Sequence, residues 1–217
     1  MKRTDCFVTP VWVVDNLPID NSKLIDHAHL LRIKNPEKRN PESYQEVNVL
    51  KWKSYDLSTT EILTVPELSK LVNLVILYAN ECFAELNPRD NAKLEFQDIW
   101  YNIYDVGADL ESHVHPGNCI SATYYVKAQD NCGDFVIGTA DRSASYQYSP
   151  RFFKDRNKFT SVKQYFKAVT NSLLLIPSNA MHWVTTNRSN EERISISFNL
   201  KLTGDNKFPP NHRLFKQ

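Results

Sequence analysis

The hydrophobic pattern of this 217-residue chain changes its period near residue 94, and the change restricts the folds open to it. Before residue 94, apolar residues recur at helical spacing, in segments that begin near Ser22 and near Thr64 or Pro66. After residue 94 the period is two, which is typical of half-buried strands. The expected strands are Phe96–Tyr104, Ser112–His115, Ser121–Lys127, Asp134–Gly138, Ser172–Ile176, His182–Asn187 and Arg193–Leu202.

Many short strands after a helical lead-in favour a barrel or jelly roll with helices packed outside it. We therefore predict an α+β protein with one domain, residues 1–217. Residues 1–93 would form a first strand and the helical lead-in, residues 94–205 the β-barrel core, and residues 206–217 a C-terminal arm. Residues 150–167 look like a long insertion rather than barrel wall.

Composition excludes several classes of protein. Lys and Arg total 26 against 25 for Asp and Glu, which gives a formal charge of +1. The chain therefore lacks the basic surplus that would indicate nucleic-acid binding. The four cysteines lack CxxC spacing and indicate reduced thiols. The first apolar run is broken by Pro10 and reads as a strand, and no apolar stretch approaches the roughly 18 residues of a membrane span. We expect a cytoplasmic protein.

The segment His113-Val114-His115 combines two imidazoles with a strand-like setting. Residues i and i+2 of a strand share a face, with β-carbons roughly 6–7 Å apart, which suits two ligands of one metal ion. His27 and His29 have the same spacing, but in a helix their side chains diverge by roughly 200°. His182 is a candidate third ligand. The alternative is a pair of surface histidines on an edge strand and a structural His182.

A polar loop follows Thr186, and we expect a hairpin in which Thr186 pairs with Arg193 and His182 with Ser197. One face would then carry His182, Val184, Thr186, Arg193, Ser195, Ser197 and Asn199, and the other Ile194, Ile196, Phe198 and Leu200. A polar barrel interior indicates a pocket. Arg193 would lie roughly 13 Å along the strand from the metal, within reach of a short dicarboxylate held there. The alternative is a solvated hairpin in which Arg193 pairs with an acid such as Glu191.

Four groups of residues together resemble the 2-oxoglutarate- and iron(II)-dependent oxygenases, and more narrowly the family of these found in bacteria and phages. The groups are His113-Val114-His115-Pro116, Ser121-Ala122-Thr123-Tyr124-Tyr125-Val126, Ile176-Pro177-Ser178 with His182, and Glu191-Glu192-Arg193-Ile194-Ser195-Ile196-Ser197. The resemblance covers most of the chain and is weakest across the helical lead-in. It implies a double-stranded β-helix, which agrees with the predicted strands, and the cofactors Fe(2+) and 2-oxoglutarate.

The resemblance also implies roles for individual residues. Arg193 would bind the far carboxylate of 2-oxoglutarate, with Ser195 beside it. Tyr125 resembles a tyrosine that assists at this carboxylate in the related prolyl hydroxylases. Asn102 and Tyr104 share a face of the preceding strand and are weaker candidates for the pocket lining. For Tyr125, Asn102 and Tyr104, ordinary barrel packing stays an equal alternative.

The metal motif departs from the wider superfamily, in which the second ligand is Asp or Glu two residues after the first histidine. Here that position holds His115. We predict a three-histidine site of His113, His115 and His182. The rival is Glu111, two residues before His113 and expected on the same strand face. Glu111 and His115 are about 13 Å apart along a strand, so they would not both join His113 on one ion.

The resemblance implies an oxidative function: hydroxylation of a small-molecule or peptide substrate by O2, with release of succinate and CO2. Two alternatives stay open, a three-histidine cupin-type dioxygenase that needs no 2-oxoacid and a non-catalytic metal- or ligand-binding barrel. The substrate is not specified by the sequence. The segment 141–167, rich in aromatic and basic residues, would either cover the pocket or pack as a solvated insertion. No membrane partner is indicated, and a homodimer is left open.

Overall fold

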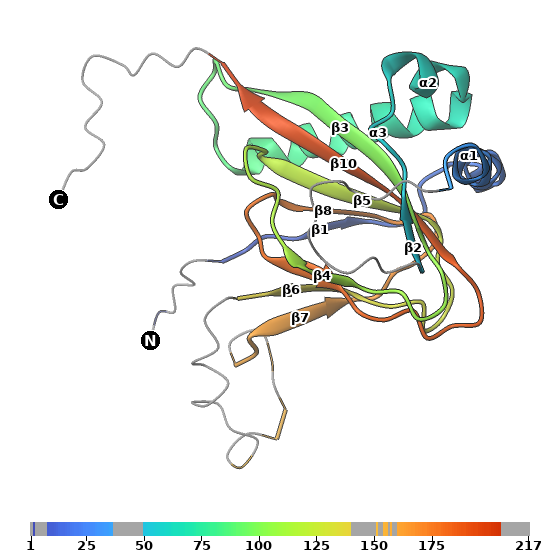
Figure 1. Ribbon diagram of the computed structural model, residues 1–217. Helices are drawn as coiled ribbons and strands as arrows, with labels where there is room; N and C mark the ends of the chain where they lie inside the picture. The colour runs from blue at the N-terminus through green and yellow to red at the C-terminus, as the bar shows by residue number, and fades with distance from the viewer. Residues whose placement is uncertain are drawn as a thin grey trace.

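A computed structural model of the protein describes residues 2, 8–36, 50–139, 151, 154, 155, 157 and 160–204 (Figure 1). Its elements, in chain order, are β1 (Trp12–Val14), α1 (Asn21–Lys34), β2 (Lys51–Lys53), α2 (Thr59–Thr64), α3 (Pro66–Glu85), β3 (Lys93–Tyr104), β4 (Leu110–His113), β5 (Ile120–Lys127), β6 (Phe135–Gly138), β7 (Lys163–Phe166), β8 (Leu173–Pro177), β9 (His182–Val184) and β10 (Arg193–Thr203). The expected C-terminal arm, 206–217, and most of segment 141–159 lie outside the described residues.

The strands form two antiparallel sheets. The larger has the order β1-β8-β5-β10-β3-β2 and the smaller the order β4-β9-β6-β7. This confirms the predicted α+β class with an antiparallel β-core and few helices. None of the described helices is both long enough and apolar enough to cross a membrane.

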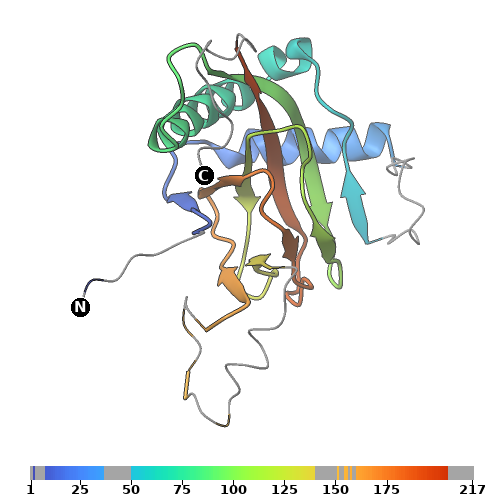
Figure 2. The same cartoon turned by 90° about the vertical axis from the view of Figure 1, so that its left-hand side faces the viewer.

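The helices pack on one face of the larger sheet (Figures 1 and 2). Side chains from α1 and α3, such as Leu24 and Leu71, share the main hydrophobic core with Ile196 and Phe198 of β10. A second, smaller cluster lies between the two sheets and includes Tyr104, Leu174, Ile176, Phe135 and Val184. Both sheets therefore contribute apolar side chains to the space between them.

The helix starts follow from local chemistry. Helix α1 begins near Ser22, as predicted, and the side chain of Asp20 caps it by accepting a hydrogen bond from the Ser22 backbone N–H. A capping box of Ser58 and Glu61 starts α2, which the hydrophobic pattern did not predict. Helix α3 begins with Pro66 in its first turn, as predicted.

Strand β10 lies at the centre of the larger sheet, between β3 and β5. Its register places Ser195 opposite Asn102 of β3 and opposite Tyr125 of β5, so these three residues share a face. The residues Ile194, Ile196, Phe198 and Leu200 all belong to the core shared with the helices. The expected alternation along this strand is therefore confirmed.

Three local predictions were wrong. The hairpin between the segments containing His182 and Arg193 does not form, because β9 pairs with β4 and β6 whereas β10 lies in the other sheet. The part of the expected insertion at Lys163–Phe166 is a wall strand, β7, paired with β6. Strand β4 ends at His113, so His115 lies just beyond the strand rather than within it.

Candidate active site

Three histidines meet at the inner face of the smaller sheet. His113 ends β4 and His182 begins β9, and the two residues are direct partners in the sheet register. His115 follows two residues after His113, where its backbone N–H donates to the Ser178 carbonyl at 2.9 Å. One ligand atom from each ring lies within 4.8 Å of the others. The structure thus brings the three predicted residues together, although a turn rather than a strand delivers His115.

Hydrogen bonds orient two of these rings. Nδ1 of His113 donates to the backbone carbonyl of Glu111 at 2.9 Å, and Nδ1 of His182 donates to that of Ala180 at 2.8 Å. A carbonyl can only accept, so the hydrogen of each ring is on Nδ1 and the lone pair is on Nε2. Such carbonyl partners fix the tautomer of metal-binding histidines. Each ring therefore presents a free lone pair to the cluster.

All three rings are neutral at pH 7. Burial lowers the pKa of His182 to about 3, and the charge that His113 would carry lowers it further. Burial and the same neighbour lower the pKa of His115 to about 4, and burial also lowers the pKa of His113. A buried group resists charging, and a like charge nearby adds to this effect. Neutral imidazoles are the form that binds a metal ion.

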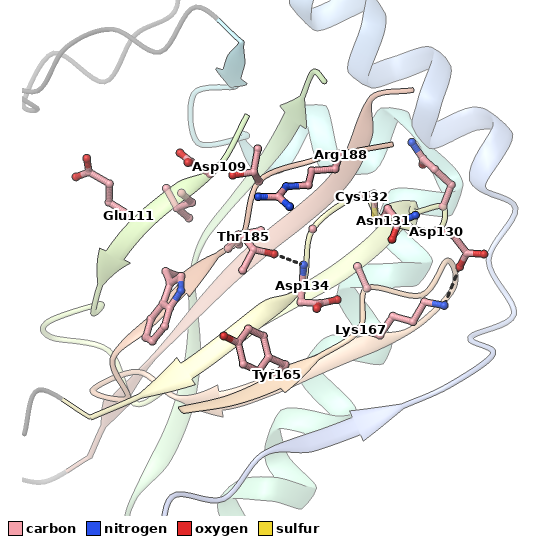
Figure 3. Close-up of a pocket in the computed structure, with 17 residues that line it drawn as sticks. Asp109, Glu111, Asp130, Asn131, Cys132, Asp134, Tyr165, Lys167, Thr185 and Arg188 are labelled. Carbon is pink, nitrogen blue, oxygen red and sulfur yellow. Dashed lines mark hydrogen bonds and ion pairs between the residues drawn. The ribbon is translucent and has the colours of Figure 1, made fainter. Parts of the chain in front are cut away.

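Glu111 does not join the histidines. The register of β4 against β9 shifts between Leu110 and His113, so the simple alternation between Glu111 and His113 is broken. The expectation that both share a face was wrong for this reason. The Glu111 side chain is exposed and lines a separate pocket of about 1140 Å³ with Trp183 and Tyr165, a pocket that none of the three histidines lines (Figure 3).

Two aromatic side chains enclose the cluster, and sequence reasoning missed both. The ring of Phe135 stacks on His182 with centroids 5.2 Å apart and planes at 17°. The ring of Trp100 lies 6.0 Å from that of His115. Strand alternation could have found Trp100, because it shares a strand face with Asn102 and Tyr104, which the sequence predicts to line the pocket.

Arg193 is buried in the same interior, with 2% of its surface exposed. Its Nη1 donates to the Gly133 carbonyl at 3.3 Å, and its guanidinium carbon lies 4.6 Å from the centre of the Tyr104 ring. Within the described part of the chain, no carboxylate forms an ion pair with it, since Glu191 pairs instead with Lys127 at 2.9 Å. The alternative of a solvated Arg193 paired with Glu191 was therefore wrong.

Two buried polar atoms near each other have no hydrogen-bond partner among the described residues: Nε of Arg193 and the hydroxyl of Tyr125. Burial raises the pKa of Tyr125 to about 12 although the charge of Arg193 opposes the shift, so the hydroxyl keeps its proton. A buried donor without a partner costs about 1–3 kcal/mol. A carboxylate would accept from both donors and neutralise the buried cation.

The other residues predicted for this pocket are also present. Ser195 is buried between Asn102 and Tyr125. The amide of Asn102 donates to the Ser197 hydroxyl at 3.0 Å and accepts from the indole N–H of Trp100 at 3.2 Å. Asn102 thus has protein partners on both sides of its amide, which favours a structural role for it.

The histidine cluster and Arg193 lie at different levels of one interior. Trp100, beside His115, pairs with Ser197, whereas Tyr104 pairs with Arg193. Four residues of strand separate the two levels, or roughly 13 Å. This matches the separation expected from the sequence, although the two sites come from different sheets rather than from one hairpin.

An antiparallel β-core with three converging neutral imidazoles and a buried arginine is consistent with a mononuclear iron oxygenase that takes a 2-oxoacid. The donor set fits the metal, because imidazole suits iron and the cluster leaves coordination positions open. The unpartnered donors of Arg193 and Tyr125 fit a carboxylate.

The comparisons with known proteins agree. The model of the family described as "Putative 2OG-Fe(II) oxygenase" matches residues 98–199, which include the three histidines and Arg193. The match covers just under half of the chain and contains the whole candidate site, so this region is similar to oxygenases that the family description links to iron(II) and 2-oxoglutarate. No curated protein matches the chain.

Solved structures show the same fold. A prolyl-4-hydroxylase from Pseudomonas putida is 15% identical, with a TM-score of 0.56, covering 88% of this chain and 92% of that one. A prolyl hydroxylase from Trichoplax adhaerens, in complex with a peptide fragment of hypoxia inducible factor, is 14% identical, with a TM-score of 0.56 over 88% and 83%. The viral collagen prolyl hydroxylase of Paramecium Bursaria Chlorella virus-1, in its 2OG complex, is 12% identical, with a TM-score of 0.53 over 88% and 95%. At these identities the likeness supports the double-stranded β-helix fold alone.

Proposed function

We propose that His113, His115 and His182 hold iron(II), and that Arg193 and Tyr125 bind the far carboxylate of 2-oxoglutarate with Ser195 beside them. The observation that carries this proposal is the pair of buried, unpartnered donors, Nε of Arg193 and the Tyr125 hydroxyl, about four strand residues from the histidines. A 2-oxoglutarate molecule whose oxoacid end lies at the metal reaches this position with its other end.

When bound, iron and 2-oxoglutarate supply the oxidation: O2 oxidises and decarboxylates 2-oxoglutarate to succinate and CO2, and a substrate C–H bond is hydroxylated. The protein supplies geometry. The carbonyls of Glu111 and Ala180 hold two imidazoles in the ligating tautomer. Phe135 packs against the ring of His182 and Trp100 against that of His115. Arg193 provides a fixed charge and needs no rearrangement to receive a carboxylate.

The substrate is proposed to be a small molecule or a peptide. A peptide is consistent with the neighbour that is in complex with a peptide fragment. A cytoplasmic location and a homodimer stay proposals. The free thiols of Cys82, Cys119 and Cys132 agree with a reducing compartment.

The first test is succinate formation by the purified protein under air with iron(II) and 2-oxoglutarate. We expect slow turnover without added substrate and none in the Arg193→Met variant. Absence of both 2-oxoglutarate binding and turnover in the wild type would favour the non-catalytic barrel. Dioxygen uptake that does not depend on 2-oxoglutarate would favour the cupin-type dioxygenase. The buried Arg193 argues against a cupin-type dioxygenase that needs no 2-oxoacid, because the charge of Arg193 needs an anionic partner.

A further inference from the structure

Strand β2 adds two lysines to the open edge of the interior. Lys53 pairs with Asn102 and Lys51 with Tyr104 in the register of β2 against β3. Directly paired residues share a face, so both lysines lie on the face that carries Trp100 and Asn102. Trp52, between them, points the other way into the helical core. An edge strand thus carries positive charge alongside the candidate active site.

The Lys53 ammonium lies against the site itself. Its Nζ is 4.2 Å from the centre of the Trp100 ring, and the Trp100 ring is in turn 6.0 Å from that of His115. Trp100 is 8% exposed, and its indole N–H donates a hydrogen bond to Asn102, so the ring is held in place beneath the Lys53 ammonium. The charges of Lys53 and Lys51 both act on His113. Lys53 therefore borders the space next to the metal cluster.

The Lys53 ammonium has no oxygen partner from the described part of the protein. Among the described residues it lies over the Trp100 ring, and no oxygen forms a hydrogen bond or ion pair with it. Burial lowers the pKa of Lys53, and the carboxylates that oppose this shift, Asp56 and Asp98, act from beyond ion-pair distance. A half-buried ammonium with three free donors is costly to maintain without an anionic partner.

We propose that Lys53, supported by Trp100, recognises a carboxylate of the oxygenase substrate and so selects monoanionic substrates. Asp56 and Asp98 also act on Lys53, so they would repel a second negative charge on a bound ligand, which disfavours a dianion such as a phosphate monoester. The inference rests on the proposed function, because the substrate must lie beside the iron for Lys53 to reach it. Lys53 is a specificity-determining residue in this account.

The test measures binding of three probes of similar shape to the nickel-loaded protein saturated with 2-oxoglutarate, which occupies Arg193. The probes are 4-fluorobenzoate, neutral 4-fluorobenzamide and dianionic 4-fluorophenyl phosphate, each followed by fluorine NMR line broadening. We expect the benzoate to bind at least about fivefold more tightly than either of the others. Lys53→Met should abolish this preference. Lys53→Arg should keep it, and so should Lys93→Met, which removes the same charge at the far end of β3.

Equal binding of benzoate and benzamide, tighter binding of the phosphate, or an unchanged preference in Lys53→Met would each overturn the inference. Proton signals of 2-oxoglutarate in the same samples report on the proposed function separately. If they show no binding in the wild type, the proposed function fails, and the inference fails with it. If 2-oxoglutarate binds and the probes show no charge preference, the inference alone fails.

Discussion

The Nε2 atoms of His115 and His182 lie 3.3 Å apart, although the two residues are 67 positions apart in the chain. The Nε2 of His182 carries a lone pair, because its Nδ1 donates to Ala180. Two nitrogen atoms at this distance either share one hydrogen or face a cation that both can bind. With His113 completing the group, the second arrangement uses all three rings.

Replacing His115 or His182 with Ala should therefore weaken iron(II) binding by at least about 100-fold, because each ring supplies one of three ligands. Glu111→Ala should leave the affinity within about twofold, since its exposed side chain lies in another pocket. Isothermal titration calorimetry under anaerobic conditions measures the iron(II) affinity of each variant. Tight binding in His115→Ala together with its loss in Glu111→Ala would reverse the assignment of the ligands.

Arg193→Met should weaken 2-oxoglutarate binding by roughly 30-fold or more, which corresponds to the 2–5 kcal/mol that removal of one partner from a buried charge pair costs. Iron binding should change little, because Arg193 lies about four strand residues from the histidines. Arg188→Met, which removes a cation from the separate pocket, is the matched control. Equal 2-oxoglutarate affinity in Arg193→Met and wild type would contradict its role.

Tyr125→Phe should weaken 2-oxoglutarate binding by about tenfold and yet stabilise the unliganded protein by up to about 1 kcal/mol. The reason is that the Tyr125 hydroxyl is buried without a partner until a carboxylate arrives. Tyr124→Phe should instead lower the free energy of unfolding by about 1 kcal/mol, because the Tyr124 hydroxyl donates a hydrogen bond to Asn21 at 2.8 Å. Urea denaturation with and without 2-oxoglutarate separates the two effects. Destabilisation by Tyr125→Phe in the absence of ligand would count against the proposal.

The metal-free protein should lose stability as the pH falls below about 6.5. In the folded state burial lowers the pKa of His182 to about 3 and that of His115 to about 4, both below the usual histidine value of 6.5. The unfolded state therefore takes up protons first, and the stability contributed by the neutral rings is present above pH 6.5 and is lost toward pH 3–4. Each ring contributes a slope of up to about 1.4 kcal/mol per pH unit.

Urea unfolding between pH 5 and 6.5 measures this slope, in a window where few carboxylates titrate. In a double variant with His115→Gln and His182→Gln, the free energy of unfolding should depend less steeply on pH. The difference in slope should correspond to about two fewer protons taken up on unfolding. An unchanged slope in that variant would show that other groups cause the pH dependence.

Phe198→Ala should destabilise the fold by about 3–5 kcal/mol, because the ring is fully buried between the larger sheet and the helices. Leu202→Ala on the same strand should cost no more than about 0.5 kcal/mol, since Leu202 is 55% exposed. Thermal unfolding of the two variants compares them directly. Similar losses would mean that the core does not lie where the structure places it.

The sequence by itself determined the class of the fold and the chemistry of the site. The alternation along β10 is a local property of extended backbone, so it assigned Ile196 to the core and Ser195 to the interior without knowledge of the partner strands. The short segment from His113 to His115 and the later His182 likewise carried the metal chemistry, because residue type and spacing are written in the chain.

The tertiary structure decided which distant segments meet. Pairing β9 with β4 and β6, rather than with β10, depends on burial and loop closure over the whole chain, which a local pattern does not encode. A register shift of β4 turned Glu111 outward, and the edge strand β2 brought Lys53 beside Trp100. Side chains separated by tens of residues become neighbours only through such non-local pairing, and for that reason the surroundings of the histidines had to come from the structure.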